Sequence, residues 1–457
     1  MDVRLKSTAG RGLLLATVLG SSLATLDGSV VNIALPHIGR DLHAPLWGLQ
    51  WTVNAYLLPL AAFVLLGGAL GDRFGRRRMF VIGVIWFTAA SVLCGAAPNI
   101  WWLIGARALQ GVGSALLTPG SLALIQSILH PDDRARAIGL WAGLGGVASA
   151  GGPLIGGYLI DALDWRWIFY INVPIALFAV IVTMRLVPES RGEAATSRFD
   201  VVGAGLGAIG LGALTFALVE GQLWTGIIGV AVLAAFVVWE MRDRAPMMPT
   251  SLFRSIEFSV INLVTLLIYG SFGGLIFFLV LQLQIVTGFS ALQAGAASIP
   301  MTFILLFGSS RASALGKRIG ARLPLALGAA IAAVGFALLI RVGFHTSYWA
   351  DVFVPIVIAG SGITLLVAPL TSTVLAAAPT PLAGVASGIN NAVARSGSLL
   401  AVAALPLIAG LSGTEYGDPH AFNHSYRIAV GICAGLLALS AVLSWVLLPK
   451  RVVAETS

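Results

Sequence analysis

The sequence has few charged residues and few cysteines, and both shortages narrow its class. Only 10% of its 457 residues are Asp, Glu, Lys or Arg, against about 25% in a typical soluble protein. With a mean hydropathy of +0.94, this composition excludes a soluble enzyme, a disordered chain and a coiled coil. Cys94 and Cys433 lie in apolar runs, so no disulfide framework or cysteine-based metal site is expected. No GxxxxGK[ST] loop occurs, which excludes ATP hydrolysis through that motif.

Long apolar runs occupy most of the chain instead. A bilayer core about 30 Å thick is crossed by about 20 helical residues, and 14 stretches of the sequence are long and apolar enough. They predict an all-α polytopic membrane protein. The expected spans are residues 12–36, 48–70, 79–97, 101–128, 138–160, 167–185, 201–220, 223–240, 258–286, 292–313, 323–342, 350–376, 386–410 and 428–448.

The basic residues test this count independently. With the N-terminus placed inside and the loops assigned alternately, 21 of the 27 Lys and Arg residues fall inside and 4 fall outside. Such an asymmetry follows the positive-inside rule, and it predicts that both termini are cytoplasmic. It also explains the pI near 10.0 without a nucleic-acid partner. Because 24 of the basic residues are Arg and only 3 are Lys, a GC-rich prokaryotic genome is indicated. The expected location is the plasma membrane of a prokaryote.

Two cytoplasmic loops share a sequence pattern. Residues 70–77 read LGDRFGRR after the second span, and residues 315–322 read LGKRIGAR after the tenth. This offset of eight spans indicates an ancient duplication of six spans, with two further spans inserted between the halves. We therefore expect an N-terminal six-helix bundle at 1–198, a two-helix insert at 199–244, and a C-terminal six-helix bundle at 245–457.

Five segments carry recognisable motifs. They are LDGSVVNIALP at 26–36, GALGDRFGRRR at 68–78, LIGARALQGVG at 103–113, GPLIGG at 152–157 and WRWIFYINVP at 165–174. Together they resemble signatures of the major facilitator superfamily, specifically its fourteen-span drug:proton antiporter branch, and the likeness runs along nearly the whole chain. The resemblance implies the major facilitator fold and a proton gradient as the energy source. It implies no cofactor, no ATP and no metal.

The resemblance also assigns roles to two of these motifs. In the loop after the second span, Asp72, Arg73, Gly75 and Arg76 would form a conformational latch on the cytoplasmic side. The plainer interpretation, a topogenic basic loop, explains the arginines but not the acid or the paired glycines. In the fifth span, the antiporter motif consists of Gly152, Pro153, Gly156 and Gly157. Small residues at these positions permit close approach of a neighbouring helix.

Asp27 and Arg107 are charged residues inside predicted spans, where charge is costly and indicates function. Asp27 lies nine residues from the outer end of its span and Arg107 six residues inside its own. At 1.5 Å per residue these depths are roughly 13 Å and 9 Å, so the two side chains are expected at a similar level. A carboxylate beside a fixed positive charge can exchange a proton, which makes the pair a candidate for proton coupling. The alternative is a static structural ion pair.

These features predict a proton-coupled antiporter that exports small amphipathic compounds such as drugs, antibiotics or secondary metabolites by alternating access. The protein would be a monomer in the lipid bilayer whose partners are protons and a small-molecule substrate. A proton-coupled symporter importing a nutrient is the alternative, followed by a membrane receptor or enzyme on the same scaffold. The candidates for lining a substrate cavity are Asn32, Trp51, Asn54, Tyr56, Gln110, Trp141, Gln282, Asn390, Asn391 and Arg395.

Arg395 also bears on substrate charge. It lies deep in the thirteenth span, whereas spans 292–313, 323–342 and 386–410 contain no Asp or Glu. The interiors of the spans then hold one acid, Asp27, against two arginines. A preference for neutral, zwitterionic or weakly anionic compounds over dications is therefore expected. A purely structural role for Arg395 is the alternative.

Overall fold

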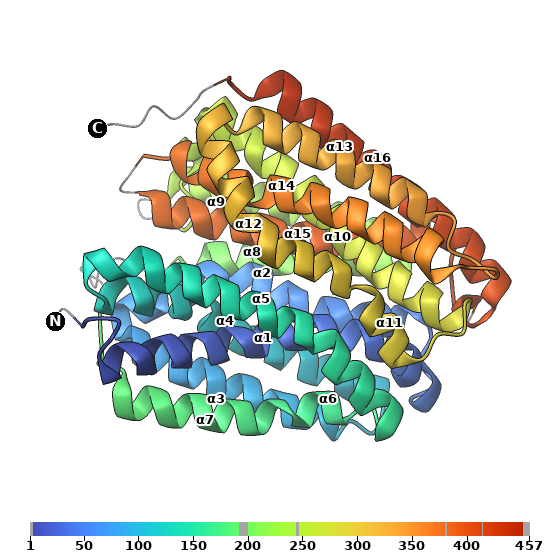
Figure 1. The fold of residues 1–457 in the computed structure, drawn as a ribbon, viewed down its shortest axis with the longest axis horizontal. Helices are drawn as coiled ribbons and strands as arrows, with labels where there is room; N and C mark the ends of the chain where they lie inside the picture. The colour runs from blue at the N-terminus through green and yellow to red at the C-terminus, as the bar shows by residue number, and fades with distance from the viewer. Residues whose placement is uncertain (1–2, 192–199, 244–245, 380–381, 414, 451–457) are drawn as a thin grey trace. The chain divides into compact units, whose positions relative to one another are not determined.

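The computed structural model describes residues 3–191, 200–243, 246–379, 382–413 and 415–450. Within these ranges the chain is helical, with one isolated β-bridge between Val3 and Leu129. Fourteen helices or helix pairs are long and apolar enough to cross a membrane (Figure 1). A helix satisfies its own backbone hydrogen bonds, which is necessary where no water is available to do so. The predicted all-α polytopic fold is confirmed.

Helices α1–α9 form the first part of the chain. Several begin at a polar cap: the Ser7 hydroxyl accepts a hydrogen bond from the amide of Gly10, and the Asn99 side chain accepts one from the amide of Trp102. Such caps satisfy amides that have no partner within the first helical turn. The helices are α1 (Thr8–Asp41), α2 (Leu46–Phe74), α3 (Arg76–Gly95), α4 (Ile100–Ile128), α5 (Pro131–Ala162), α6 (Trp167–Tyr170), α7 (Asn172–Leu186), α8 (Val201–Glu220) and α9 (Leu223–Arg242).

The second part has the same kind of organisation. Its elements are the 3-10 helix η1 (Thr250–Arg254), α10 (Ile256–Ile285), α11 (Ala291–Ala297), α12 (Ile299–Ile319), α13 (Arg322–Leu339), the π-helical turn η2 (Tyr348–Phe353), α14 (Val354–Ala376), α15 (Ala383–Ile408), η4 (Glu415–Gly417) and α16 (Pro419–Leu447). Every predicted span coincides with one of these helices or helix pairs. The sixth, tenth and twelfth spans are each interrupted near one end, where Pro174, Pro300 and Pro355 lie in the first turn of the helix that follows. Proline fits that position because the amide it lacks has no helical partner there.

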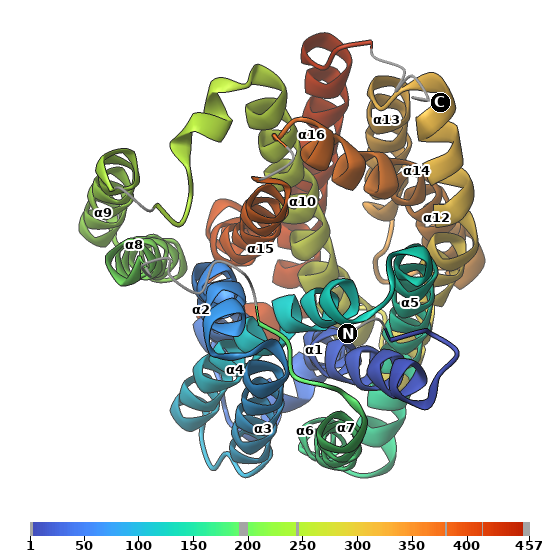
Figure 2. The same ribbon diagram turned by 90° about the vertical axis from the view of Figure 1, so that its left-hand side faces the viewer.

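Contacts divide the chain into two compact units, one of Met1–Leu214 with Leu223–Met247 and the other of Thr215–Gln222 with Met248–Ser457. The first unit contains the contacts α1–α5, α1–α7, α2–α4, α3–α4 and α3–α7. The second contains α10–α15, α10–α16, α12–α14, α13–α14 and α13–α16. Numbered by span, these are the same five pairs, as the predicted duplication requires. Figure 2 shows α1 bordered within its unit by α4, α5 and α7.

The two inserted helices pack on each other through glycine. A β-carbon on Gly229 of α9 would lie 2.7 Å from the backbone nitrogen of Leu214 on α8, and one on Gly210 would lie 2.8 Å from the Leu233 side chain. At one end of the pair, the Asp200 carboxylate accepts hydrogen bonds from the amide of Gly203 and from the indole of Trp239. These contacts make α8 and α9 a paired hairpin. Whether this insert forms a separate part of the molecule, with the boundaries proposed above, stays a prediction.

Candidate functional site

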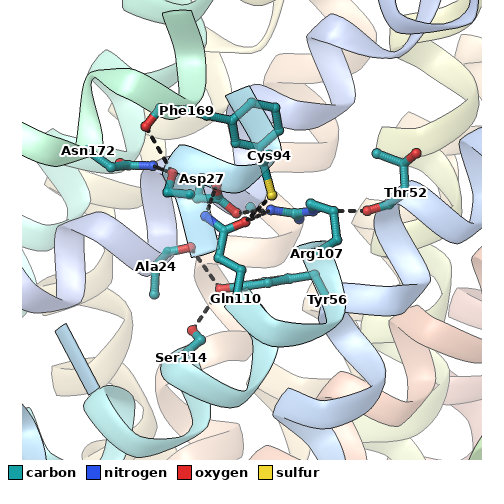
Figure 3. A network of polar contacts seen from close by, with 12 residues as sticks. Ala24, Asp27, Thr52, Tyr56, Cys94, Arg107, Gln110, Ser114, Phe169 and Asn172 are labelled. Atoms are coloured by element: carbon teal, nitrogen blue, oxygen red, sulfur yellow. Dashed lines mark hydrogen bonds and ion pairs between the residues drawn. The ribbon is translucent and has the colours of Figure 1, made fainter. Parts of the chain in front are cut away.

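Asp27 and Arg107 meet inside the first unit, as their similar depths predict. An Arg107 guanidinium nitrogen lies 2.5 Å from Asp27 Oδ2, and the two residues are 2% and 1% exposed. Asp27 comes from the middle of α1 and Arg107 from the N-terminal part of α4. A buried ion pair of this kind is costly to desolvate, so it needs further hydrogen bonds to be stable. The surrounding residues supply them (Figure 3).

Gln110 connects both members of the pair. Its Nε2 donates to Asp27 Oδ1 at 2.8 Å, while its Oε1 accepts from Arg107 at 2.6 Å. Gln110 is one helical turn beyond Arg107 on α4, so both side chains project from the same face of that helix. Arg107 Nε donates in addition to the backbone oxygen of Thr52 on α2 at 3.0 Å. Helices α1, α2 and α4 therefore meet in one hydrogen-bonded network around the Asp27 carboxylate.

Aromatic and hydroxyl groups enclose this network. The Arg107 guanidinium lies over the Tyr56 ring, 4.4 Å from its centroid, in a position that favours a cation. The Tyr56 hydroxyl is 2.8 Å from the hydroxyl of Ser114. Sequence reasoning missed Ser114, although its spacing of seven residues from Arg107 places it on the same face of α4. The thiol of Cys94, on α3, contacts Gln110 Oε1 at 3.5 Å.

A second polar contact behind the network was also missed. Asn172, at the start of α7, donates to the hydroxyl of Ser91 at 2.9 Å, and Ser91 donates in turn to the backbone oxygen of Phe169. The Phe169 ring lies 5.9 Å from the Arg107 guanidinium carbon. Asn172 thereby fixes the helix interruption at α6–α7 that presents this ring to the arginine. Asn172 lies in the motif at residues 165–174, so the sequence indicated its importance. Its partner Ser91, on α3, lies in no motif.

The glycine-rich helix α5 packs on α1 beside Asp27. A β-carbon on Gly152 would lie 2.8 Å from the Ser29 hydroxyl and 2.9 Å from the Leu26 side chain, and one on Gly156 would collide with the side chain of Val30. Pro153 and Gly157 are buried in the same helix, which runs unbroken through the proline. The small residues are therefore required by the close approach of the two helices.

An ion pair holds the loop between α2 and α3. Asp72 forms an ion pair with Arg76 at 2.7 Å, and the chain turns between them at Gly75, whose φ of +106° favours glycine. The Arg73 guanidinium lies 5.6 Å from the centroid of the Phe74 ring. The four latch candidates are thus close together at the α2–α3 corner.

The acid at the N-terminus of α3 is not Asp72, although Asp72 precedes that helix in the sequence and an acid is expected at such a position. Asp72 lies in the last turn of α2, whereas the acid at the N-terminus of α3 is Glu189, which follows α7. Its two carboxylate oxygens accept hydrogen bonds from the amides of Arg77 and Arg78 at 2.9 and 3.2 Å. Negative charge is favoured at that end of a helix. Sequence reasoning missed Glu189 because it lies more than 100 residues away along the chain.

The remaining candidates of the first unit have different surroundings. Asn32 donates to the Gly28 backbone oxygen of its own helix at 2.9 Å, and the half-buried Trp141 donates to Ser21 at 3.0 Å. Trp51 is half-buried. Asn54 is fully buried, and neither its amide nitrogen nor its oxygen has a hydrogen-bond partner among the described residues. A buried amide without partners calls for an explanation, and it keeps Asn54 a candidate for a polar ligand contact.

In the second unit, two candidates hydrogen-bond to neighbouring segments and two are exposed. Gln282 is fully buried and donates to Val342 O at 3.0 Å and to Asn423 at 2.7 Å. Asn390 donates to Asn262 and Thr265 on α10 at 3.0 and 2.8 Å. By contrast, Asn391 and Arg395 are exposed on α15. Among the described residues, no group of three or more His, Cys, Asp or Glu is placed to hold a metal ion.

Comparison with known proteins agrees with this architecture. The family model described as Major Facilitator Superfamily matches residues 17–402. The chain belongs to this superfamily, whose members are multi-pass transporters of small molecules. Its fourteen spans and its resistance-protein relatives place it in the fourteen-span multidrug efflux branch. The predicted major facilitator fold, with two six-helix bundles and a two-helix insert, is confirmed.

Similar curated proteins confer resistance. The chain is 35% identical to the puromycin resistance protein pur8 of Streptomyces alboniger, over 96% of this chain and 91% of that protein. It is 36% identical to the multidrug resistance protein Stp of Mycobacterium tuberculosis (strain CDC 1551 / Oshkosh), over 89% and 77%. Among solved structures, the POT family transporter PepTSo shares the fold with a TM-score of 0.72 at 15% identity, over 95% of this chain and 97% of that one.

Proposed function

We propose that this protein is a proton-coupled antiporter that exports small amphipathic compounds across the plasma membrane of a prokaryote. The buried network of Asp27, Arg107 and Gln110 carries the proposal, because it places one titratable carboxylate in the interior of a membrane protein. The resistance functions named for the relatives support export. The protein would act as a monomer with both termini in the cytoplasm, energised by the proton gradient and without a cofactor.

Proton coupling follows from the partners of Asp27. While the carboxylate is charged, it neutralises Arg107 and is held by Gln110. When a proton arrives, the attraction between Asp27 and Arg107 is lost, and the hydrogen bonds of Arg107 to Gln110 and Thr52 must hold the cation alone. A substrate that binds one of these two states better than the other shifts their populations. Proton and substrate are then exchanged if each favours the opposite state.

Alternating access would use two arrangements of the six-helix bundles. The corner with Asp72, Arg73, Gly75 and Arg76 would act as the latch of one arrangement, since its ion pair lies between two spanning helices. The packing of Gly152 and Gly156 on α1 supports antiport, because α5 contacts the helix that carries the proton site. Import in symport with protons is the competing function, and it predicts the opposite relation between the directions of substrate and proton movement.

Transport in proteoliposomes with an imposed pH gradient tests the proposal. The wild type should move substrate against its concentration gradient and opposite to the proton flux, whereas Asp27→Asn should abolish this gradient-driven movement. Asparagine keeps the shape and can still bond to Gln110, so folding and insertion should persist. Glu220→Gln, which removes an exposed carboxylate at the end of α8, is the matched control and should transport normally.

Two results would contradict the proposal. Concentrative, gradient-driven efflux by Asp27→Asn would remove the assignment of the proton site. Substrate movement in the same direction as protons in the wild type would establish symport instead.

A further inference from the structure

Arg395 occupies the middle of a spanning helix in the second unit. Helix α15 extends over Ala383–Ile408, so Arg395 is roughly 18 Å from either end at 1.5 Å per residue. An arginine side chain is too short to reach the lipid headgroups from such a depth. A charge there is expensive unless it is paired or lies in water.

This charge has no acidic and no hydrogen-bonded partner in the part of the chain that the structure describes. Arg395 has no ion pair and no hydrogen bond from its side chain to any described residue. The acids of the neighbouring helices lie at their ends: Glu257 is in the first turn of α10 and Asp351 in the first turn of η2. The charge of Arg395 acts on the phenol of Tyr269, which belongs to α10 across the α10–α15 contact. Arg107, by comparison, donates hydrogen bonds to three residues, Asp27, Gln110 and Thr52.

The helix face that carries Arg395 is unlike a lipid-facing surface. Gly384, Gly388 and Asn391 precede Arg395 at helical spacing on the same side of α15. Gly384, Asn391 and Arg395 are exposed, and Gly388 is half-buried. This surface thus contains an amide, a guanidinium and two glycines, and no apolar side chain.

The exposed surfaces of other helices in this unit show the contrast. On α13 the exposed residues at helical spacing are Leu327, Ile331 and Val334, and on α16 they are Leu439, Val442 and Val446. These apolar surfaces are suited to lipid. The polar surface of α15 is therefore expected to line a water-filled path through the membrane, where the transported compound passes.

We propose that Arg395, with Asn391 beside it, binds an anionic group of the transported compound, such as a carboxylate or a phenolate. This inference rests on the proposed export function and names the substrate class for it. A guanidinium presents its donors in a fixed fork that matches a carboxylate. The Asn391 amide nitrogen donates to Ser387 O at 3.1 Å, which leaves its oxygen free to accept a hydrogen bond from a neighbouring hydroxyl of the same compound.

Equilibrium dialysis of the purified full-length protein tests this site without a gradient. The probes are anthraquinone-2-carboxylate and its uncharged carboxamide, which share one flat ring system. The wild type should bind the carboxylate about tenfold or more tightly than the carboxamide, since a hydrogen bond to a charged group has that strength. Arg395→Gln should reduce carboxylate affinity by a similar factor and leave carboxamide affinity unchanged. Arg395→Lys should retain part of the preference for the carboxylate, because an ammonium keeps the positive charge but lacks the paired donors of a guanidinium.

A matched control and a competitor complete the experiment. Arg341→Gln removes an exposed arginine just beyond α13 and should leave both affinities unchanged. Excess inorganic phosphate should not displace the carboxylate if the ring contributes to binding, whereas full displacement would assign the site to inorganic anions and overturn the proposal. If Arg395→Gln does not melt cooperatively, the proposal is tested with the other two proteins alone, by comparing the carboxylate preference of the wild type with that of Arg395→Lys.

Several results would overturn the proposal: no carboxylate preference in the wild type, including no binding of either probe, or a preference fully kept in Arg395→Gln. Gradient-driven transport of the same probes is measured separately. If binding shows the preference but no gradient-driven movement occurs, the export function fails and the anion site stands. If movement occurs without any effect of Arg395, the site fails and the export function stands.

Discussion

Replacing Arg107 with methionine removes the cation of the buried pair while keeping an unbranched side chain in its place. The variant leaves Asp27 Oδ2 without its partner at 2.5 Å and Gln110 Oε1 without its partner at 2.6 Å. Removing one member of a buried ion pair costs about 3–5 kcal/mol. Since about 2–4 °C of melting temperature corresponds to 1 kcal/mol in units of 150–250 residues, a decrease of about 6–20 °C is expected.

The decrease should depend on pH, and its sign follows from proton binding. In Arg107→Met, the buried Asp27 carboxylate relieves its lack of a cation by binding a proton in the folded state. The folded state then holds more protons than the unfolded state near neutral pH, so stability increases as pH falls from about 8 to about 5. The wild type, whose carboxylate keeps its partner, is the reference at each pH.

The double variant Asp27→Asn/Arg107→Met separates the effect of the uncompensated Asp27 charge from the effect of losing the Arg107 side chain. It contains no buried charge at this site, and the asparagine amide introduced at position 27 can bond reciprocally with Gln110, so most of the lost melting temperature should return. Melting followed by intrinsic fluorescence in detergent, at several pH values, provides the comparison. The reasoning is refuted if Arg107→Met melts within about 2 °C of the wild type, or if the double variant melts no higher than the single one.

Two further substitutions address helix packing and the latch. Gly111→Ala places a β-carbon against the Tyr56 backbone oxygen and should destabilise by about 1–3 kcal/mol. Gly105→Ala on the same helix meets nothing within 4 Å and should not lower the melting temperature. Asp72→Asn removes the ion pair to Arg76 and should favour the inward-open state, which slows turnover without loss of substrate binding. Increased reactivity of a single cysteine introduced on the cytoplasmic side of either bundle would report that shift.

Each of these outcomes has a clear opposite. Equal melting temperatures for the two alanine variants would show that the α2–α4 contact is not tight in solution. Unchanged cysteine reactivity and turnover in Asp72→Asn, while Asp72→Glu behaves as the wild type does, would remove the latch role from this ion pair.

The sequence was most informative where charge conflicts with a membrane. Asp27 and Arg107 could be paired by depth alone, because helix rise converts residue counts into distance from the surface. The number of spans could also be predicted, because both signals for it are local in the sequence: the length of each apolar run and the distribution of arginines between successive loops. Interruptions such as the one at Ile171, between α6 and α7, could not be placed, because hydropathy is continuous across them.

Contacts between distant segments were beyond this reasoning. Glu189 accepts hydrogen bonds at the start of α3, and Ser91 accepts one from Asn172. Neither residue stands out in the sequence, because only tertiary packing brings it to its partner. Gln282 and Asn390 looked like cavity residues because they are polar and lie within spans. The structure shows that they hydrogen-bond to neighbouring helices, which is the other way a membrane protein satisfies a buried amide.

One turn of α1 carries both the proposed proton site and the residues on which α5 packs, and this arrangement limits which substitutions the protein can accept. Val30 fills the space left by Gly156, while Asp27 lies three residues earlier on the same rigid turn. A larger residue at 156 would push this turn aside and move the carboxylate relative to Arg107. Among natural variants of this chain, positions 30 and 156 should therefore change together, with any gain in volume at one matched by a loss at the other.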